Sequence, residues 1–204
     1  MSKELEAARK LVRMLEEKER TGGAVPCNVV ELGTLNAGAV FKIAEHDFIV
    51  LEQQEGQTAV ISKAFMAEDI VFGESKDYKT SNIKELIERD IQAIIENAVG
   101  AENLVEHEVD LTSVDMQNEY GTYGCKVRPI TFDEARKYND LLVNKELSDW
   151  WWTCTPWSTE ERGWKYSIAA VSPSGYFYLN FYFNNCGVRP FCILKSNIFV
   201  SKGE

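Results

Sequence analysis

The chain has few of the residues that metal centres and disulfide frameworks require. Its 204 residues include only two histidines, His46 and His107, far apart in the sequence and without a cysteine or carboxylate at ligand spacing. The five cysteines form an odd and scattered set, which is typical of reduced, buried thiols. They are Cys27, Cys125, Cys154, Cys186 and Cys192. We therefore expect no disulfide framework, no metal and no cofactor.

Catalytic motifs are missing as well. The sequence has no glycine-rich phosphate loop, no dinucleotide fingerprint and no serine-nucleophile elbow. The acidic run EHEVDLTSVD (106–115) lacks the tight alternation of a calcium loop, so we expect solvated carboxylates there. These absences favour a protein that is not an enzyme. One enzymatic alternative stays open, an activity that uses Cys186 and Cys192, which share a strand parity.

Basic charge and long apolar runs are also scarce. The formal net charge is -10, so no lysine and arginine surplus exists to displace counterions from nucleic acid or to attract an anionic membrane. No apolar run approaches the roughly 18 residues of a membrane span, which argues against membrane insertion. The first ten residues, MSKELEAARK, are charged throughout and do not resemble a secretion signal. We expect synthesis and folding in the cytoplasm.

A helix-forming segment begins the chain. Residues 3–20 contain neither glycine nor proline, and Leu5, Ala8, Val12 and Leu15 follow the 3-4-3 spacing of a short coiled-coil seam. A helix of this length is marginal alone in water, so it requires a partner. It either packs on its own domain or self-associates into a homo-oligomer. We assign residues 1–24 to this helix and its linker, and residues 25–204 to one domain.

The rest of the chain mixes strands and helices. Three strand-like runs between residues 39 and 65 indicate an antiparallel meander. A helix follows from Asn82, with Asn82 and Glu85 as its capping box and Gly100 at its end. Its apolar face comprises Ile83, Leu86, Ile87, Ile91, Ile94, Ile95 and Val99. Residues 103–111 suggest a strand, 115–126 a loop, and 131–142 a second helix capped by Thr131 and Glu134. This order predicts an α+β fold of antiparallel sheet with two helices.

The C-terminal part is aromatic, and its central strand, YFYLNFYFN, lies between two predicted turns, SPSG (172–175) and NNCG (184–187). Alternation places one uniformly apolar set toward the core: Phe177, Leu179, Phe181 and Phe183. The opposite set is Tyr176, Tyr178, Asn180, Tyr182 and Asn184. Tyrosine and asparagine without charge are typical of recognition surfaces, so this face is a candidate ligand-binding surface. The alternative is that the tyrosines cover another element of the same domain.

All five tryptophans lie between residues 150 and 164. Three consecutive exposed indoles would form an aggregation-prone patch, so we expect Trp151 and Trp152 in the core. Pro156 then turns the chain into a surface loop that carries Trp157 and Trp164. These last two are candidates for ligand contact.

The segments WWTCTP (151–156), VSPSG (171–175) and GVRPF (187–191) together resemble the signature of a bacterial and phage domain family of unknown function. The likeness extends over about residues 35–200. It implies a C-type-lectin-like fold, shared with formylglycine-generating enzymes and with the variable proteins of diversity-generating retroelements. It also makes Trp151, Trp152, Pro156, Gly187, Arg189 and Pro190 structural signature positions. We expect a structural role for Arg189, whose guanidinium has five donors that tie the last strand to loop carbonyls.

Two departures limit what the resemblance implies. Cys154 stands where the family usually has arginine, and the calcium-dependent sugar-binding motifs of true C-type lectins are missing. Neither sugar binding through calcium nor the oxidase chemistry is carried over. We expect a non-enzymatic recognition module, prophage-associated, that binds a protein or glycan. The alternatives are a structural assembly component of a phage particle or, third, an oxidase that uses the cysteines; either of the first two could be virion-associated.

Overall fold

The computed structural model describes residues 29–203 and confirms an α+β fold built mainly from antiparallel sheet. The predicted helix at residues 1–24 and its linker lie outside the described residues, as does Cys27. Within residues 29–203, no helix has both the length and the apolar character needed to cross a membrane.

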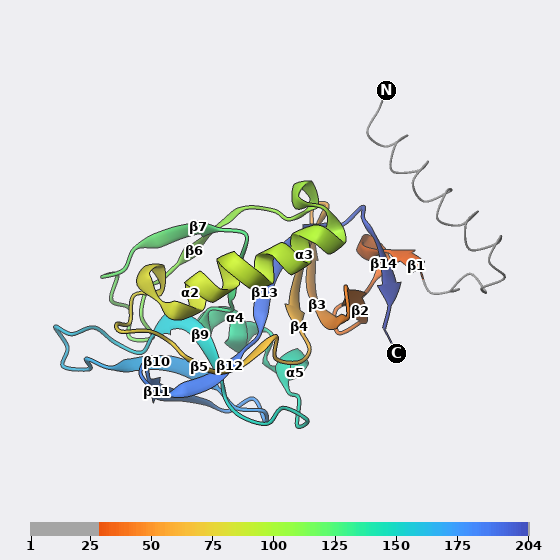
Figure 1. Ribbon diagram of the computed structural model, residues 1–204. Helices are drawn as coiled ribbons and strands as arrows, with labels where there is room; N and C mark the ends of the chain where they lie inside the picture. The colour runs from red at the N-terminus through yellow and green to blue at the C-terminus, as the bar shows by residue number, and fades with distance from the viewer. Residues whose placement is uncertain (1–28, 204) are drawn as a thin grey trace, which may run out of the picture.

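Three sheets make up the domain (Figure 1). The largest has seven strands in the order β1 (Val29–Glu31), β14 (Phe199–Lys202), β2 (Val40–Ile43), β3 (His46–Gln54), β4 (Gln57–Ser62), β13 (Pro190–Lys195), β8 (Val127–Pro129). The second has five, in the order β11 (Phe177–Phe181), β10 (Ser167–Val171), β9 (Trp151–Pro156), β12 (Asn185–Val188), β5 (Ala67–Val71). A two-stranded sheet joins β6 (His107–Asp110) and β7 (Thr122–Cys125). The predicted meander is confirmed as β2–β3–β4, whereas the loop predicted at 115–126 is wrong in part, because β7 lies within it.

The first predicted helix is confirmed, but its N-cap is Ser81, one residue before the predicted cap Asn82. The side chain of Ser81, not Asn82, accepts the capping hydrogen bond from the backbone N–H of Lys84. The helix is α2 (Asn82–Leu86), a π-helical turn (Ile87–Ile91) and α3 (Gln92–Val99), and Gly100 ends it with a φ of 90°. In Figure 1 it crosses the molecule between the β6–β7 hairpin and the five-stranded sheet.

The π-helical turn has a physical reason in the sequence. The fully buried side chains on this helix recur every four residues, at Ile83, Ile87, Ile91 and Ile95. An ideal α-helix has 3.6 residues per turn, so a strict four-residue repeat drifts around its axis, and one wider turn reduces that drift. Ile94, predicted on the same face, is exposed, so that assignment is wrong.

The second helix is confirmed together with its cap. It comprises α4 (Phe132–Lys137) and α5 (Asn139–Leu142), and Thr131 and Glu134 form the complete capping box. Glu134 also accepts two hydrogen bonds from Arg128 on β8, at 2.6 and 2.7 Å. The start of α4 is thereby fixed to the seven-stranded sheet.

Arg189 links the two large sheets where the chain passes from β12 to β13. Its guanidinium is fully buried and donates to the carbonyl oxygens of Ser62 and Leu142, at 2.9 Å each. It also lies over the ring of Trp151, 4.9 Å from the centroid. Burial without a carboxylate partner lowers the pKa of Arg189 to about 10. The predicted structural role of Arg189 is confirmed.

The other predicted signature positions are buried as well. Gly187 leaves no room for a side chain, because a Cβ there would lie 2.5 Å from the ring of Phe65. Pro156 is the last residue of β9, and Pro190 begins β13 opposite Pro129 of β8.

Candidate ligand-binding site

The candidate site is built on β9, whose six residues are all buried. Trp151 and Trp152 are fully buried and belong to two different hydrophobic clusters, one on each side of the strand. The indole N–H of Trp152 donates to the carbonyl of Ile70 at 2.8 Å, and its ring meets Phe72 edge to face. The prediction that these two indoles are core is confirmed. Trp150 is half-buried and contacts the ring of Tyr176, with 6.0 Å between centroids.

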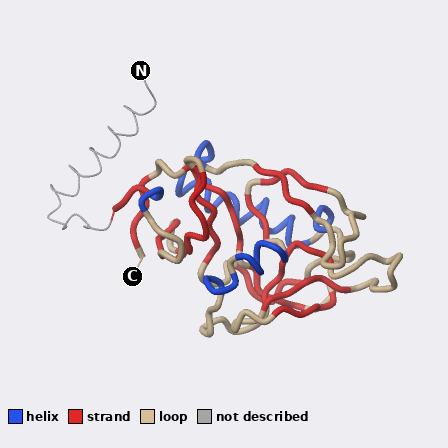
Figure 2. Tube along the Cα trace, turned by 180° about the vertical axis from the view of Figure 1, so that it is seen from behind, coloured by secondary structure: helices blue, strands red, loops and turns tan. Residues whose placement is uncertain are grey.

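The loop from 157 to 166 follows β9 and projects from the end of the molecule (Figures 1 and 2). Buried Lys76 holds its two arms together, because the ammonium donates to the carbonyl oxygens of Ser158, at 2.9 Å, and of Trp164, at 2.6 Å. Desolvation lowers the pKa of Lys76, against the opposing fields of nearby carboxylates. Trp164 remains half-exposed at the end of this clamp.

The loop is less open than the sequence predicts. Ser158 and Thr159 are buried, and Trp157 is half-buried with its ring 6.4 Å from that of Phe132 on α4. Trp157 therefore packs the loop against α4 and is only partly accessible to a ligand, whereas the indole of Trp164 is accessible.

The β10–β11 hairpin carries the tyrosines. Every residue of β10 is buried, and Gly175, at a φ of 80°, closes the turn to β11 as predicted from SPSG. At the start of β11 the predicted alternation holds: Tyr176, just before the strand, and Tyr178 are exposed, while Phe177 is half-buried against Phe132, with 5.3 Å between centroids. The two tyrosine rings are stacked at 6.4 Å.

The predicted alternation fails beyond Leu179. Phe181 and Phe183, predicted as core, are exposed, whereas Asn180 and Tyr182 are half-buried. The strand ends at Phe181 and a turn covers 182–184, since the chain must leave the sheet edge to reach β12 on the far side of β9 and β10.

The predicted NNCG turn is wrong by a few residues for the same reason. Asn184 belongs to the turn, but Asn185–Val188 is strand β12. The Asn180 amide stabilises the turn: its oxygen accepts from the Phe181 backbone N–H and from the Asn184 side chain, and its nitrogen lies 3.1 Å from the sulfur of Cys186. Asn180 was predicted to contact the ligand, but in the structure its side chain stabilises this turn.

We define the aromatic rim as the exposed aromatic side chains around β11: Trp164, Tyr166, Tyr176, Tyr178, Phe181 and Phe183. All of its members except Trp164 make ring contacts with one another or with half-buried neighbours, in two groups. One group joins Trp150, Tyr176 and Tyr178, and the other joins Tyr166, Phe181, Tyr182 and Phe183. Three members, Trp164, Tyr176 and Tyr178, were predicted from the sequence, whereas Tyr166, Phe181 and Phe183 were not.

A sequence signal for the missed residues exists. From Tyr166 to Val188 the chain has no Asp, Glu, Lys or Arg, although 26% of all residues are charged. When neither face of a strand carries charge, alternation does not show which face is buried. Whether Phe181 and Phe183 are buried or exposed therefore could not be predicted from alternation alone.

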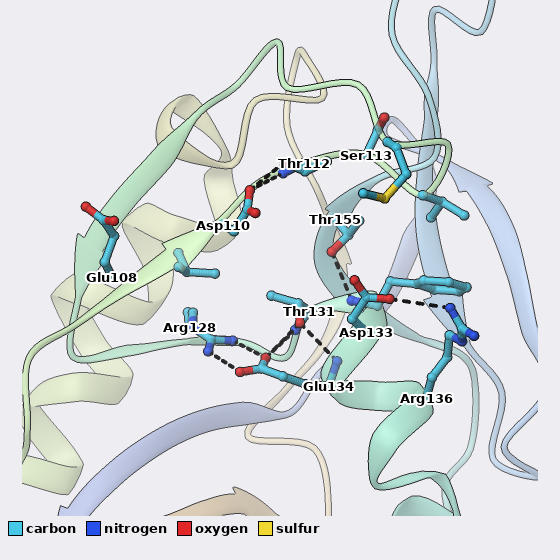
Figure 3. A pocket seen from close by; sticks show the side chains of 14 residues that line it. Glu108, Asp110, Thr112, Ser113, Arg128, Thr131, Asp133, Glu134, Arg136 and Thr155 are labelled. Carbon is cyan, nitrogen blue, oxygen red and sulfur yellow. Dashed lines mark hydrogen bonds and ion pairs between the residues drawn. The ribbon is translucent and has the colours of Figure 1, made fainter.

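A separate hollow of about 410 Å³ lies where β6, β8, β9 and α4 meet (Figure 3). Its polar wall includes Asp110, Arg128, Asp133, Glu134 and Thr155. Figure 3 shows them engaged with their neighbours: Arg128 with Glu134, Asp133 with Arg136, Asp110 with Thr112, and Thr155 with the Phe132 backbone. This hollow was not predicted, because its walls come from four segments that lie apart in the sequence.

The cysteines are buried and free within the described residues. Desolvation raises the pKa of Cys125 to about 11 and that of Cys154, Cys186 and Cys192 to about 12. Cys186 lies on β12 and Cys192 on β13, in different sheets, so they do not share a strand. Protonated, buried thiols do not favour nucleophilic or redox chemistry.

Comparison with other proteins adds no assignment. No protein-family model matches the sequence, and no similar protein is found among curated proteins or among solved structures. The resemblance carried by WWTCTP, VSPSG and GVRPF therefore stays a prediction.

Proposed function

We propose that this protein is a non-enzymatic recognition module, on a C-type-lectin-like scaffold, whose ligand surface is the aromatic rim. The observation that carries the proposal is the exposure of six aromatic side chains around one strand at the edge of the five-stranded sheet. Grouped large apolar side chains on a surface mark interaction sites, since leaving them in water is unfavourable. The ligand is a protein or a glycan, because rigid aromatic rings supply contact area to both at low entropic cost.

Several features of the site support binding rather than catalysis. The chain is uncharged from Tyr166 to Val188, the rings of Tyr176 and Tyr178 are stacked on one another, and the loop bearing Trp164 is clamped by Lys76. A pre-organised surface of this kind loses little conformational entropy when a ligand binds. The prophage association and the homo-oligomer formed through residues 1–24 are parts of the same proposal.

The test compares the full chain with a double variant, Tyr176→Ala plus Tyr178→Ala. Both tyrosines are exposed, so the variant keeps its core, whereas Tyr182 is half-buried and unsuitable. Each protein is applied to an array of bacterial surface glycans and to a displayed peptide library. We expect a ligand class whose affinity for the double variant falls at least about tenfold, as for aromatic hot spots.

Phe199→Ala is the matched control, because Phe199 is an exposed aromatic on β14 in the other large sheet. Its ligand binding is expected to equal that of the unaltered chain. Equal losses in both variants, or wild-type binding by the folded double variant, would refute the rim as the ligand surface.

A further inference from the structure

One edge of the five-stranded sheet is unprotected. β11 pairs with β10 on one side, and no strand within residues 29–203 pairs with its other side. The opposite edge strand, β5, carries Glu68 and Asp69, the kind of charges that protect exposed edges from pairing. β11 has neither charge nor proline.

The backbone hydrogen bonds show which groups point outward. The N–H of Ser172 donates to the carbonyl of Tyr176, and the N–H of Tyr182 donates to the carbonyl of Tyr166. In an antiparallel ladder these bonds recur at every second residue, so the even-numbered residues of β11 face β10. The odd-numbered residues Phe177, Leu179 and Phe181 direct their N–H and C=O groups away from the sheet.

At the C-terminal end of β11, the backbone N–H and C=O of Phe181 already have partners within the turn. The N–H of Phe181 donates to the side chain of Asn180, and its carbonyl accepts from the N–H of Asn184. What remains is a short edge with two donors and two acceptors, those of Phe177 and Leu179.

We infer that the free edges of β11 in two copies of this chain pair antiparallel about a two-fold axis through Tyr178. In this register Phe177 of each copy lies opposite Leu179 of the other, and four intermolecular hydrogen bonds satisfy all four donors. Closed two-fold association through one self-complementary patch is the commonest form of homo-oligomer.

The uncharged edge of β11 fits a second copy of this chain as the occupant. Two chains that each carry a net charge of -10 repel one another over most of their surfaces. The segment 166–188 is the stretch that lacks charge altogether, so close approach of two copies is least opposed there. An acidic or basic partner would find no complementary group along this edge.

The pairing also enlarges the proposed ligand surface. Residues directly opposite one another in a sheet project to the same face, so Tyr176 and Tyr178 of both copies would form one continuous face of four tyrosines. Edge pairing does not require a ligand, so the pairing can be tested separately from the proposed function.

The test is site-specific cross-linking of the full chain in a Cys27→Ser background, where the four remaining thiols are buried. Position 178 lies opposite itself, at the Cα separation of about 4.5–5.5 Å of antiparallel pairs, which suits a disulfide. Position 176 lies opposite residue 180, so its two copies are about 13 Å apart, beyond the roughly 7 Å that a disulfide bridges. We expect mild oxidation to yield at least about tenfold more dimer from Tyr178→Cys than from Tyr176→Cys.

Tyr176→Cys is the matched control, because both side chains are exposed on the same strand and any association through residues 1–24 would affect both variants alike. Equal yields, or no dimer at position 178, would overturn the pairing. Leu179→Pro supplies a second measurement. Proline there removes a donor that faces away from β10, and with it two of the four intermolecular bonds.

Sedimentation of full-chain Leu179→Pro should show a dissociation constant at least about tenfold weaker for this contact. Unchanged association of the folded variant would contradict the inference. If the variant does not fold, the cross-linking comparison decides. Wild-type ligand binding by the folded tyrosine double variant, together with cross-linking at position 178, would refute the proposed ligand surface and leave the pairing standing.

Discussion

Replacing Glu134 with glutamine should destabilise the fold more than any exposed charge change. Glu134 accepts from both terminal nitrogens of Arg128, at 2.6 and 2.7 Å, and from the backbone N–H of Thr131 at 2.8 Å. The guanidinium of Arg128 is buried, its Nε donates to the ring nitrogen of His107, and it lies 4.3 Å from the ring centroid of Phe191. Without Glu134, that cation has no carboxylate partner.

The magnitude follows from leaving a buried charge unpaired. Removing one partner of a buried ion pair costs about 3–5 kcal/mol, because the remaining ion keeps its desolvation penalty. A glutamine amide keeps the shape but directs N–H groups toward donors of Arg128 or Thr131. We expect the free energy of unfolding of Glu134→Gln, measured by urea denaturation, to fall by this amount.

Arg136→Ala is the control on the same helix. Its ion pair with Asp133 is 3.5 Å long and largely exposed, and such pairs contribute about 0–1 kcal/mol. A loss below about 1 kcal/mol for Glu134→Gln, or equal losses for the two variants, would refute the reasoning.

The cluster of Arg128, Glu134 and His107 should also make the free energy of unfolding depend on pH in the acid range. Burial alone would raise the pKa of Glu134, but the hydrogen bonds and charge of Arg128 outweigh it and lower the pKa below 4.5. Burial and the charge of Arg128 lower the pKa of His107 below 6.5. In both cases the unfolded chain binds the proton more readily, so the stabilisation is complete above the unfolded pKa and is lost as the pH falls. We expect unfolding free energy to decline from about pH 6.5 and again below 4.5, and the second decline to shrink in Glu134→Gln.

Three further outcomes are expected. Lys76→Met removes both hydrogen bonds that hold Ser158 and Trp164, so acrylamide quenching of tryptophan fluorescence should rise, and unfolding free energy should fall by about 2–4 kcal/mol; unchanged quenching would contradict the clamp. Thiol titration of the native chain should label at most the one cysteine outside the described residues, against all five in urea, because the other pKa values are raised; rapid labelling of more would be inconsistent with their burial. Gly187→Ala places a methyl against the ring of Phe65 and should lower the melting temperature, with a cost of about 1–3 kcal/mol; an unchanged melting temperature would mean that the ring moves freely.

Local patterns predicted much of the fold. The meander, both helices, the capping box of Thr131 and Glu134, and the buried pair Trp151 and Trp152 are confirmed. These features depend on residues close in sequence, where side-chain period and capping chemistry act directly. The carbonyl hydrogen bonds of Arg189 are also present as predicted, although that prediction came from the resemblance and not from a local pattern.

The candidate site was predicted only in part. Trp164, Tyr176 and Tyr178 are exposed as expected, while Trp157, Asn180 and Tyr182 are half-buried. Parity is a reliable guide only while a strand continues, and nothing local in YFYLNFYF marks where β11 ends.

Local sequence patterns were sufficient to predict the central meander, both helices and an exposed tyrosine pair in the C-terminal part, but they missed β7 and placed a turn where β12 begins. The residue at which the chain leaves β11 depends instead on strand pairing between segments that lie far apart in the sequence. β12 pairs with β9 and β5 on the far side of the sheet, so the chain must leave β11 at Phe181. Contacts between segments far apart in sequence, which no local period encodes, brought Phe181 and Phe183 out to solvent and left the edge of β11 free.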